Sequence, residues 1–269
     1  TGEGRNEALG NAASQWANVD LNGAVAWVQQ LPEGTAKQHA LQNISGQWAQ
    51  SDPQGAATFA MNLPAGEGRN SLFRNIAQQW AANDPQAAKN WAAQLPDGEN
   101  KNEVLSNIGS SWAGNSPEEA ADFVTTLPPG EGQNRAAGSV VSQWANSDPQ
   151  AAAAWASAFA ESPLREDAFR NIASQWANSD STGLANWLQT LPAGPSRDAA
   201  IGAFVERASS FDPASAVQWA QSINSPEMRN NQIQNVARNW LNIDPASARN
   251  WILQSALPAN QKQELLSQP

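Results

Sequence analysis

The sequence of 269 residues contains no cysteine, no tyrosine and a single histidine, His39. The lack of cysteine excludes disulfides, thiolate chemistry and cysteine-ligated metals, and a lone histidine excludes any site that needs two imidazoles. No apolar run approaches the roughly 18 to 20 residues that a membrane-spanning helix requires. We therefore expect no membrane insertion and no metal centre.

Basic residues are also scarce, because 15 Lys and Arg stand against 25 Asp and Glu, which gives a formal net charge of −10. Phosphate backbones and anionic lipid surfaces are bound by clustered Lys and Arg. The charge balance therefore argues against a nucleic-acid partner. The acidic, cysteine-free and amide-rich composition favours a secreted or cell-envelope protein, with a cytoplasmic location as the alternative.

Tryptophan, by contrast, is abundant, and its 13 residues follow a fixed spacing. One series recurs every 32 residues from Trp16, and a second series, which includes Phe59 and Phe123, recurs every 32 residues from Trp27. Such a period indicates a tandem-repeat architecture. We expect the rings to form the structural core and to mesh successive repeats together. The tryptophans assigned to this core are Trp16, Trp27, Trp48, Trp80, Trp91, Trp112, Trp144, Trp155, Trp176, Trp187, Trp219, Trp240 and Trp251.

Each repeat is predicted to form two helices. In the third repeat the apolar residues fall on one helical face from about Glu67 to Ala82. An Asp-Pro pair, Asp84-Pro85, then caps and opens the second helix, and a Leu-Pro pair ends it. Small residues such as Ala88 are expected to let helices approach closely.

A hairpin of this size cannot bury both of its apolar faces alone, and stacking on its neighbours buries them. The sequence therefore predicts an all-α protein, a right-handed α-solenoid of eight helix-turn-helix repeats. We expect one continuous array over residues 1–256, with a further unit or a C-terminal cap starting in residues 257–269. The units are residues 1–32, 33–64, 65–96, 97–128, 129–160, 161–192, 193–224 and 225–256.

The array resembles the tetratricopeptide-like superfamily of helical-hairpin repeats. The resemblance lies in the paired helices, in the small Ala at close-approach positions and in the Pro after the second helix. The chain differs from the tetratricopeptide consensus in its repeat of 32 rather than 34 residues, and it lacks the Trp-x-x-Leu-Gly-x-x-Tyr run. The resemblance implies a scaffold that binds proteins or peptides along a concave face, and it carries over no individual binding residue.

Two further series of polar residues keep the same period. A base recurs in the first turn of the first helix, for example at Lys37, Arg69 and Arg229, where it opposes the helix dipole. We expect each base to pair with an Asp cap or with helix C-terminal carbonyls of the adjacent unit, with its stem against the Trp rings. Amides such as Asn43 and Asn75 flank the apolar face. They either grip a peptide backbone or, as we favour, join neighbouring hairpins.

The outward positions of the first helix vary from unit to unit, as they would on a surface that encodes a specific partner or, alternatively, on a solvent-exposed face under no selection. The candidate partner-facing residues are Glu7, His39, Arg74, Glu103, Arg135 and Arg170. No nucleophile motif, phosphate-binding loop or selected carboxylate pair points to catalysis. We therefore expect a non-enzymatic protein with no catalytic residue and no cofactor.

Two functions stay open on this basis. The first is a non-catalytic protein- or peptide-binding repeat scaffold. The alternative is a structural array that self-associates head to tail, or that acts as a spacer within a longer secreted or envelope protein. In either case the expected partner is a protein or peptide, which in the second case is another copy of the chain.

Overall fold

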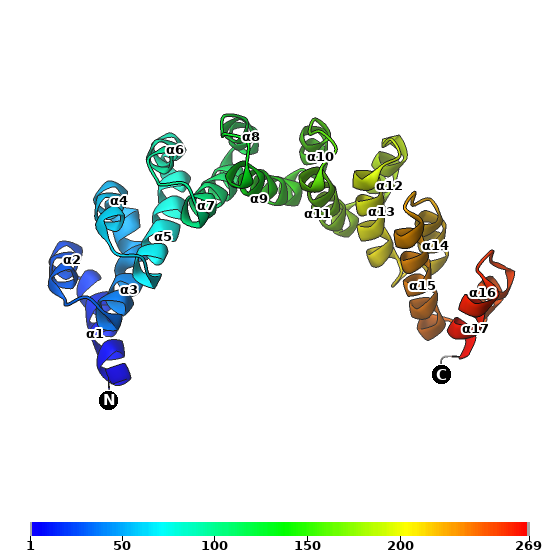
Figure 1. Ribbon diagram of the computed structural model, residues 1–269, viewed down its shortest axis with the longest axis horizontal. Helices are drawn as coiled ribbons and strands as arrows, with labels where there is room; N and C mark the ends of the chain where they lie inside the picture. Colours follow the sequence, from blue (N-terminus) through cyan, green and yellow to red (C-terminus); the bar gives the residue numbers. More distant parts are fainter. Residues whose placement is uncertain (1, 268–269) are drawn as a thin grey trace. The chain divides into compact units, whose positions relative to one another are not determined.

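The computed structural model describes residues 2–267, and this part of the chain contains seventeen α-helices and no strand (Figure 1). The first sixteen helices form eight hairpins, and each hairpin lies inside one of the predicted 32-residue units. Neighbouring helices pack on one another in sequential order. The protein is therefore an all-α solenoid, as the spacing of the tryptophans predicts. Thr1, Gln268 and Pro269 lie outside the described residues.

The chain divides into two compact units, residues 1–143 and 144–269, and the division falls inside helix α9 (Glu131–Ser147). The expectation of a single continuous array over residues 1–256 stays a prediction. The first unit also contains α1 (Gly2–Ala17), α2 (Leu21–Gln30), α3 (Thr35–Ser51), α4 (Pro53–Asn62), α5 (Glu67–Asn83), α6 (Pro85–Ala93), α7 (Glu99–Asn115) and α8 (Pro117–Thr125). The second unit also contains α10 (Pro149–Ser157), α11 (Pro163–Ser179), α12 (Ser181–Thr190), α13 (Pro195–Ala208), α14 (Pro213–Gln221), α15 (Pro226–Ile243), α16 (Pro245–Gln254) and α17 (Ala259–Ser267).

The Asp-Pro pair lies at the start of the second helix, as predicted. The Asp84 carboxylate accepts a hydrogen bond of 3.0 Å from the backbone N–H of Ala87, and Pro85 is the first residue of α6. This bond satisfies one of the free N–H groups of the first helical turn. Ser116 differs, because it makes no side-chain cap bond to α8. The same carboxylate cap is formed by Asp20, Asp52, Asp148, Asp180, Asp212 and Asp244.

In the first unit, the helices form two layers. Helices α1, α3, α5 and α7 pack side by side in one layer, and α2, α4, α6 and α8 form a second layer on one side of it (Figure 1). Each second helix packs on the first helix of its own hairpin, and α2, α4 and α6 also pack on the first helix of the next one. Within residues 2–143 no comparable packing joins α2 to α4 or α4 to α6. The second helices are therefore further apart than the first helices.

Glycines allow the first helices to pack closely. A Cβ atom at Gly109 of α7 would lie 3.2 Å from Val140 Cγ2 and 3.3 Å from the carbonyl oxygen of Ala136, both in α9 and both within the first unit. A Cβ atom at Gly138, also in α9, would meet nothing within 4 Å. Gly109 is thus required by a close approach, whereas Gly138 is not. On the second helices, fully buried alanines occupy the predicted positions, namely Ala56, Ala88, Ala120, Ala152, Ala216 and Ala248.

The aromatic rings pair within hairpins. The ring centroids of Trp80 in α5 and Trp91 in α6 are 6.0 Å apart, and those of Trp48 and Phe59 are 5.2 Å apart. Equivalent pairs occur in each hairpin of the described residues, with centroid distances between 5.2 and 6.1 Å. The two positions of the aromatic series therefore face each other across one hairpin, and the expectation that the rings also mesh successive repeats stays a prediction.

The predicted core tryptophans differ in burial. Trp16 is 42 % exposed, because α1 packs against another first helix, α3, on one side only. Six others are half-buried: Trp27, Trp80, Trp155, Trp187, Trp219 and Trp251. The remaining six are buried: Trp48, Trp91, Trp112, Trp144, Trp176 and Trp240.

The seventh hairpin departs from the pattern where Ala208 takes the place of a tryptophan. Helix α13 ends at Ala208, and Phe204, one turn earlier, meets Trp219 edge-on with 5.5 Å between ring centroids. Phe204 therefore supplies the missing ring of the pair. Phe211, in the turn that follows, is 60 % exposed.

Helix α17 occupies the region for which a further unit or a cap is expected. Leu265 of α17 is buried against Ala237 of α15 and Ile252 of α16. Lys262 Nζ donates a 2.9 Å hydrogen bond to the carbonyl oxygen of Leu253 in α16. The helix thus packs as the first helix of a hairpin does, and the choice between a further unit and a cap stays open.

Candidate functional site

The six predicted partner-facing residues lie on the first helices. Glu7, His39, Arg135 and Arg170 are exposed, whereas Arg74 and Glu103 are half-buried. Arg170 Nη1 contacts Asp167 Oδ1 of the same helix at 2.5 Å. The structure thus places these residues at the surface, and their role toward a partner stays a prediction.

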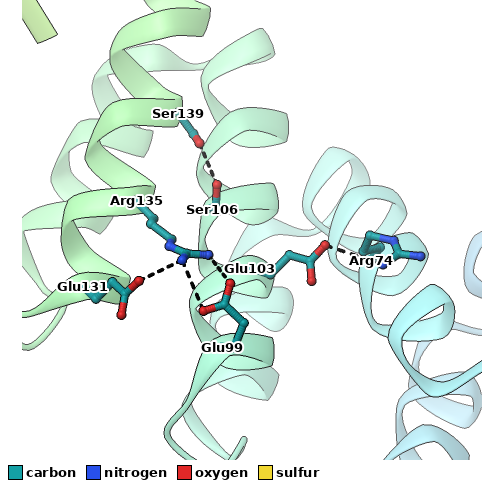
Figure 2. Close-up of polar contacts among 7 residues, drawn as sticks. All are labelled: Arg74, Glu99, Glu103, Ser106, Glu131, Arg135 and Ser139. Carbon is teal, nitrogen blue, oxygen red and sulfur yellow. Dashed lines mark hydrogen bonds and ion pairs between the residues drawn. The ribbon is translucent and has the colours of Figure 1, made fainter. Parts of the chain in front are cut away.

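Three of these residues take part in two separate sets of ion pairs that join neighbouring first helices of the first unit (Figure 2). Arg74 Nη1 of α5 lies 3.6 Å from Glu103 Oε1 of α7. Arg135 of α9 donates to Glu99 of α7 at 2.5 and 3.1 Å and to Glu131 at 2.7 Å. Hydrogen bonds from its guanidinium to Glu99 and Glu131 raise the pKa of Arg135. These charges already have partners inside the protein, so a ligand has to compete with them.

Several of the recurring bases contact carbonyl groups near the C-terminal ends of the preceding second helices. Lys37 Nζ donates to the Gln29 carbonyl at 3.0 Å, and Arg229 Nη1 donates to the Ile223 carbonyl at 2.9 Å. A cation at this end of a helix is favoured by the helix dipole. The carbonyl alternative of the sequence prediction is therefore confirmed for these residues. Arg197 makes a further contact of this kind with the Leu188 carbonyl, and Gln133, which stands in place of a base, donates to the Val124 carbonyl.

Acids near these bases come from the turns between repeats, not from the Asp caps. Lys37 pairs with Glu33 at 2.7 Å, Lys101 with Asp97 at 2.9 Å, and Arg165 with Glu161 at 3.4 Å, each four residues earlier. Phenylalanine rings lie beneath two of the bases, at positions where tryptophan rings are expected. The guanidinium carbons of Arg69 and Arg165 lie 5.7 and 4.9 Å from the ring centroids of Phe73 and Phe169, respectively.

The amide series makes a contact between hairpins. Asn75 Nδ2 of α5 donates a 2.6 Å hydrogen bond to Ser45 Oγ of α3. Asn43, in contrast, is exposed on α3. The favoured interpretation, that these amides join neighbouring hairpins, is confirmed at Asn75.

A groove of about 330 Å³ lies between α4 and α6, and we call it the α4–α6 groove. Its lining combines carboxamides and a hydroxyl with indole rings and a thioether, and no ionisable side chain lines it. Trp91 is only 4 % exposed, and its Nε1 has no hydrogen-bond partner, although a buried donor without an acceptor costs about 1–3 kcal/mol. The lining residues are Gln54, Ala57, Thr58, Met61, Trp80, Ala87, Asn90, Trp91 and Gln94.

Sequence reasoning missed this groove because it looked for a partner surface on the first helices. The available signal was the carboxamides on two successive second helices, Gln54 on α4 with Asn90 on α6 and Gln94 at the C-cap of α6. A search for polar side chains on the second helices would have found it.

A second cavity, of about 400 Å³, adjoins the same region and shares Met61 with the groove. It lies beside the base Arg69 and the turn that follows α6, and we call it the Arg69 pocket. Two cavities of about 330 Å³ occupy equivalent places beside Lys101 and beside Arg229. The lining residues of the Arg69 pocket are Met61, Arg69, Phe73, Leu95, Pro96, Asp97, Gly98, Glu99, Asn100 and Lys101.

Among residues 2–267, no group of three or more His, Asp or Glu side chains is arranged to hold a metal ion. None of the helices in that range combines the length and the apolar character needed to span a bilayer. Comparison of the chain with protein-family models, with curated proteins and with solved structures gave no match in any of the three. The case for a function therefore rests on the geometry of the groove and of the pocket.

Proposed function

We propose that the protein is a non-catalytic scaffold that binds a protein or peptide segment, and that the α4–α6 groove is one of its contact sites. The observation that carries this proposal is the indole N–H of Trp91, a buried donor without a partner in the lining of an uncharged groove. Because this nitrogen is buried, an acceptor such as a peptide carbonyl reaches it only when the side chains around it move aside.

The rest of the lining suits a peptide as well. Gln54, Asn90 and Gln94 carry side-chain amides, which both donate and accept hydrogen bonds and so match the two polar groups of a peptide unit. Met61, 43 % exposed, offers a flexible apolar surface for a side chain of the ligand. The absence of charge from the lining favours a neutral stretch of the partner chain.

The assignment of the repeat to a known class of helical arrays is also a proposal. We infer that the chain is a tetratricopeptide-like array, and its sequential two-helix hairpins with small residues at close contacts support this inference. The right-handed superhelix and the secreted or cell-envelope location stay predictions.

Selection from a random peptide library, followed by nuclear magnetic resonance, tests the scaffold proposal. Selected peptides should shift the Trp91 Nε1–H signal. Thr58→Trp should weaken their binding at least tenfold, because the new ring fills the groove. Ala154→Trp, at the equivalent exposed position of α10, should leave binding unchanged. Failure to select any peptide, or equal binding to the Thr58→Trp variant, contradicts the proposal.

A second candidate function, self-association, is favoured by two exposed apolar side chains. Phe211 and Ile243 occupy the same position in successive hairpins of the second unit and are 60 % and 51 % exposed. Sedimentation velocity over a range of protein concentrations tests this role. A self-associating array should grow with concentration, and the Phe211→Ser/Ile243→Ser variant should not. A monomer at every concentration contradicts it.

A further inference from the structure

Arg69 lacks the acidic partner that three equivalent bases have. Lys37, Lys101 and Arg165 each pair with an acid four residues earlier, but the residue four positions before Arg69 is Ala65. No Asp or Glu of the described residues lies within 4.0 Å of the Arg69 guanidinium.

The hydrogen bonds of Arg69 are also incomplete. Its Nη1 reaches the Leu63 carbonyl only at 3.5 Å, whereas Arg229 makes the equivalent bond at 2.9 Å. The Nε atom of Arg69 is buried and has no partner. A guanidinium carries five N–H donors, so this side chain has hydrogen-bonding capacity that the protein itself does not use.

The acids that line the Arg69 pocket are already neutralised by other cations. Asp97 pairs with Lys101 at 2.9 Å. Glu99 is held by Arg135 of α9, as Figure 2 shows. Arg69 is therefore the one charged side chain in the pocket lining without an oppositely charged partner.

The remaining walls of the pocket are largely apolar. Phe73 and Leu95 are 7 % and 4 % exposed, and Met61 and Pro96 complete the apolar lining. The volume of about 400 Å³ falls in the range of small-molecule sites, roughly 300–1,000 Å³. A cation next to such walls is complementary to an anion that carries a short hydrocarbon chain.

We propose that the Arg69 pocket binds a small aliphatic carboxylate. The carboxylate pairs with the guanidinium of Arg69, whose planar fork matches the two carboxylate oxygens. The hydrocarbon chain lies against Met61, Phe73 and Leu95. This site is separate in chemistry from the uncharged α4–α6 groove, so the proposal stands or fails independently of peptide binding.

Titration with hexanoate tests the proposal, with hexanamide as the uncharged analogue. The Arg69 Nε–H signal in nuclear magnetic resonance should shift with hexanoate, and hexanamide should bind at least tenfold more weakly. Equal binding of the two compounds, or an Arg69 signal that does not move at any hexanoate concentration the protein tolerates, overturns the proposal.

Three variants locate the site, and their binding is measured by calorimetry. Arg69→Met should weaken hexanoate binding at least tenfold. Ala65→Glu should weaken it as strongly without removing any group, because it supplies the acid that Lys37, Lys101 and Arg165 already have. Arg165→Met, a matched change at a base paired with Glu161, should leave binding unchanged. Undiminished binding by a folded Ala65→Glu variant overturns the assignment.

Discussion

At the scale of single residues, the recurring base makes a short hydrogen bond to a carbonyl in one hairpin and a long one in another. Arg229 donates to the Ile223 carbonyl at 2.9 Å, whereas Arg69 reaches the Leu63 carbonyl only at 3.5 Å. We expect Arg229→Met to lower the free energy of unfolding by about 1.5 kcal/mol, because a hydrogen bond from a charged donor is lost. Arg69→Met should cost less. Urea denaturation followed by tryptophan fluorescence measures both, and equal losses would show that bond length does not set the contribution.

A second residue-scale prediction concerns the helix caps. Hydrogen bonds from the side chain and the backbone N–H of Ser247 hold the pKa of Asp244 below its usual range. A pKa lowered by folding contributes stability above the unfolded pKa, and this contribution is lost as the pH falls through the folded value. Ser247→Ala should raise the pKa of Asp244 toward its usual value, so that the cap fails at a higher pH. Titration of the Asp244 carboxyl carbon measures this shift, and an unchanged midpoint contradicts it.

At the scale of the helix, packing determines whether replacement of a glycine by alanine stabilises the protein. Replacement of either Gly109 or Gly138 by alanine gains about 0.5–1 kcal/mol of helix propensity. A Cβ atom at Gly138 has open space, but one at Gly109 lies 3.2 Å from Val140 and 3.3 Å from the Ala136 carbonyl. We therefore expect Gly138→Ala to stabilise the protein and Gly109→Ala to lose that gain. Thermal unfolding compares the two, and an equal rise in melting temperature would contradict close helix packing at Gly109.

The helices themselves could be predicted from local chemistry, whereas contacts between repeats could not. The pattern from Glu67 predicts a helix to Ala82, and α5 ends at Asn83. It ends there because Asp84 caps the next helix, α6, which begins at Pro85. The ion pair between Arg74 and Glu103 could not be predicted from the sequence. Comparison of equivalent positions treats each position alone, but this ion pair joins two different positions of neighbouring repeats.

The candidate site escaped prediction for a related reason. The Arg69 pocket depends on what is missing at Ala65, and the importance of that alanine emerges only from the acids that pair with Lys37 and Lys101. The α4–α6 groove depends on the wider separation of the second helices. That separation is a property of neighbouring repeats packed together, which no single repeat encodes.

At the scale of the whole molecule, the pattern of contacts governs how stability spreads along the chain. Helix α5 packs on α3, α4, α6 and α7, so each hairpin draws its stability from adjacent ones. In such an array, stability is a sum of repeat terms and nearest-neighbour terms. Local opening is therefore expected to differ between parts of the chain.

Leu72→Ala tests this nearest-neighbour character. Leu72 of α5 is fully buried, and its truncation should cost about 2–5 kcal/mol locally. We expect amide hydrogen exchange, measured by mass spectrometry, to accelerate in α3 to α7 and to stay unchanged in α15 and α16, because the loss acts through direct neighbours. Gln78→Ala, at an exposed position of the same helix, serves as the control and should change little. Equal acceleration along the whole chain would instead mean that the array unfolds as one cooperative unit.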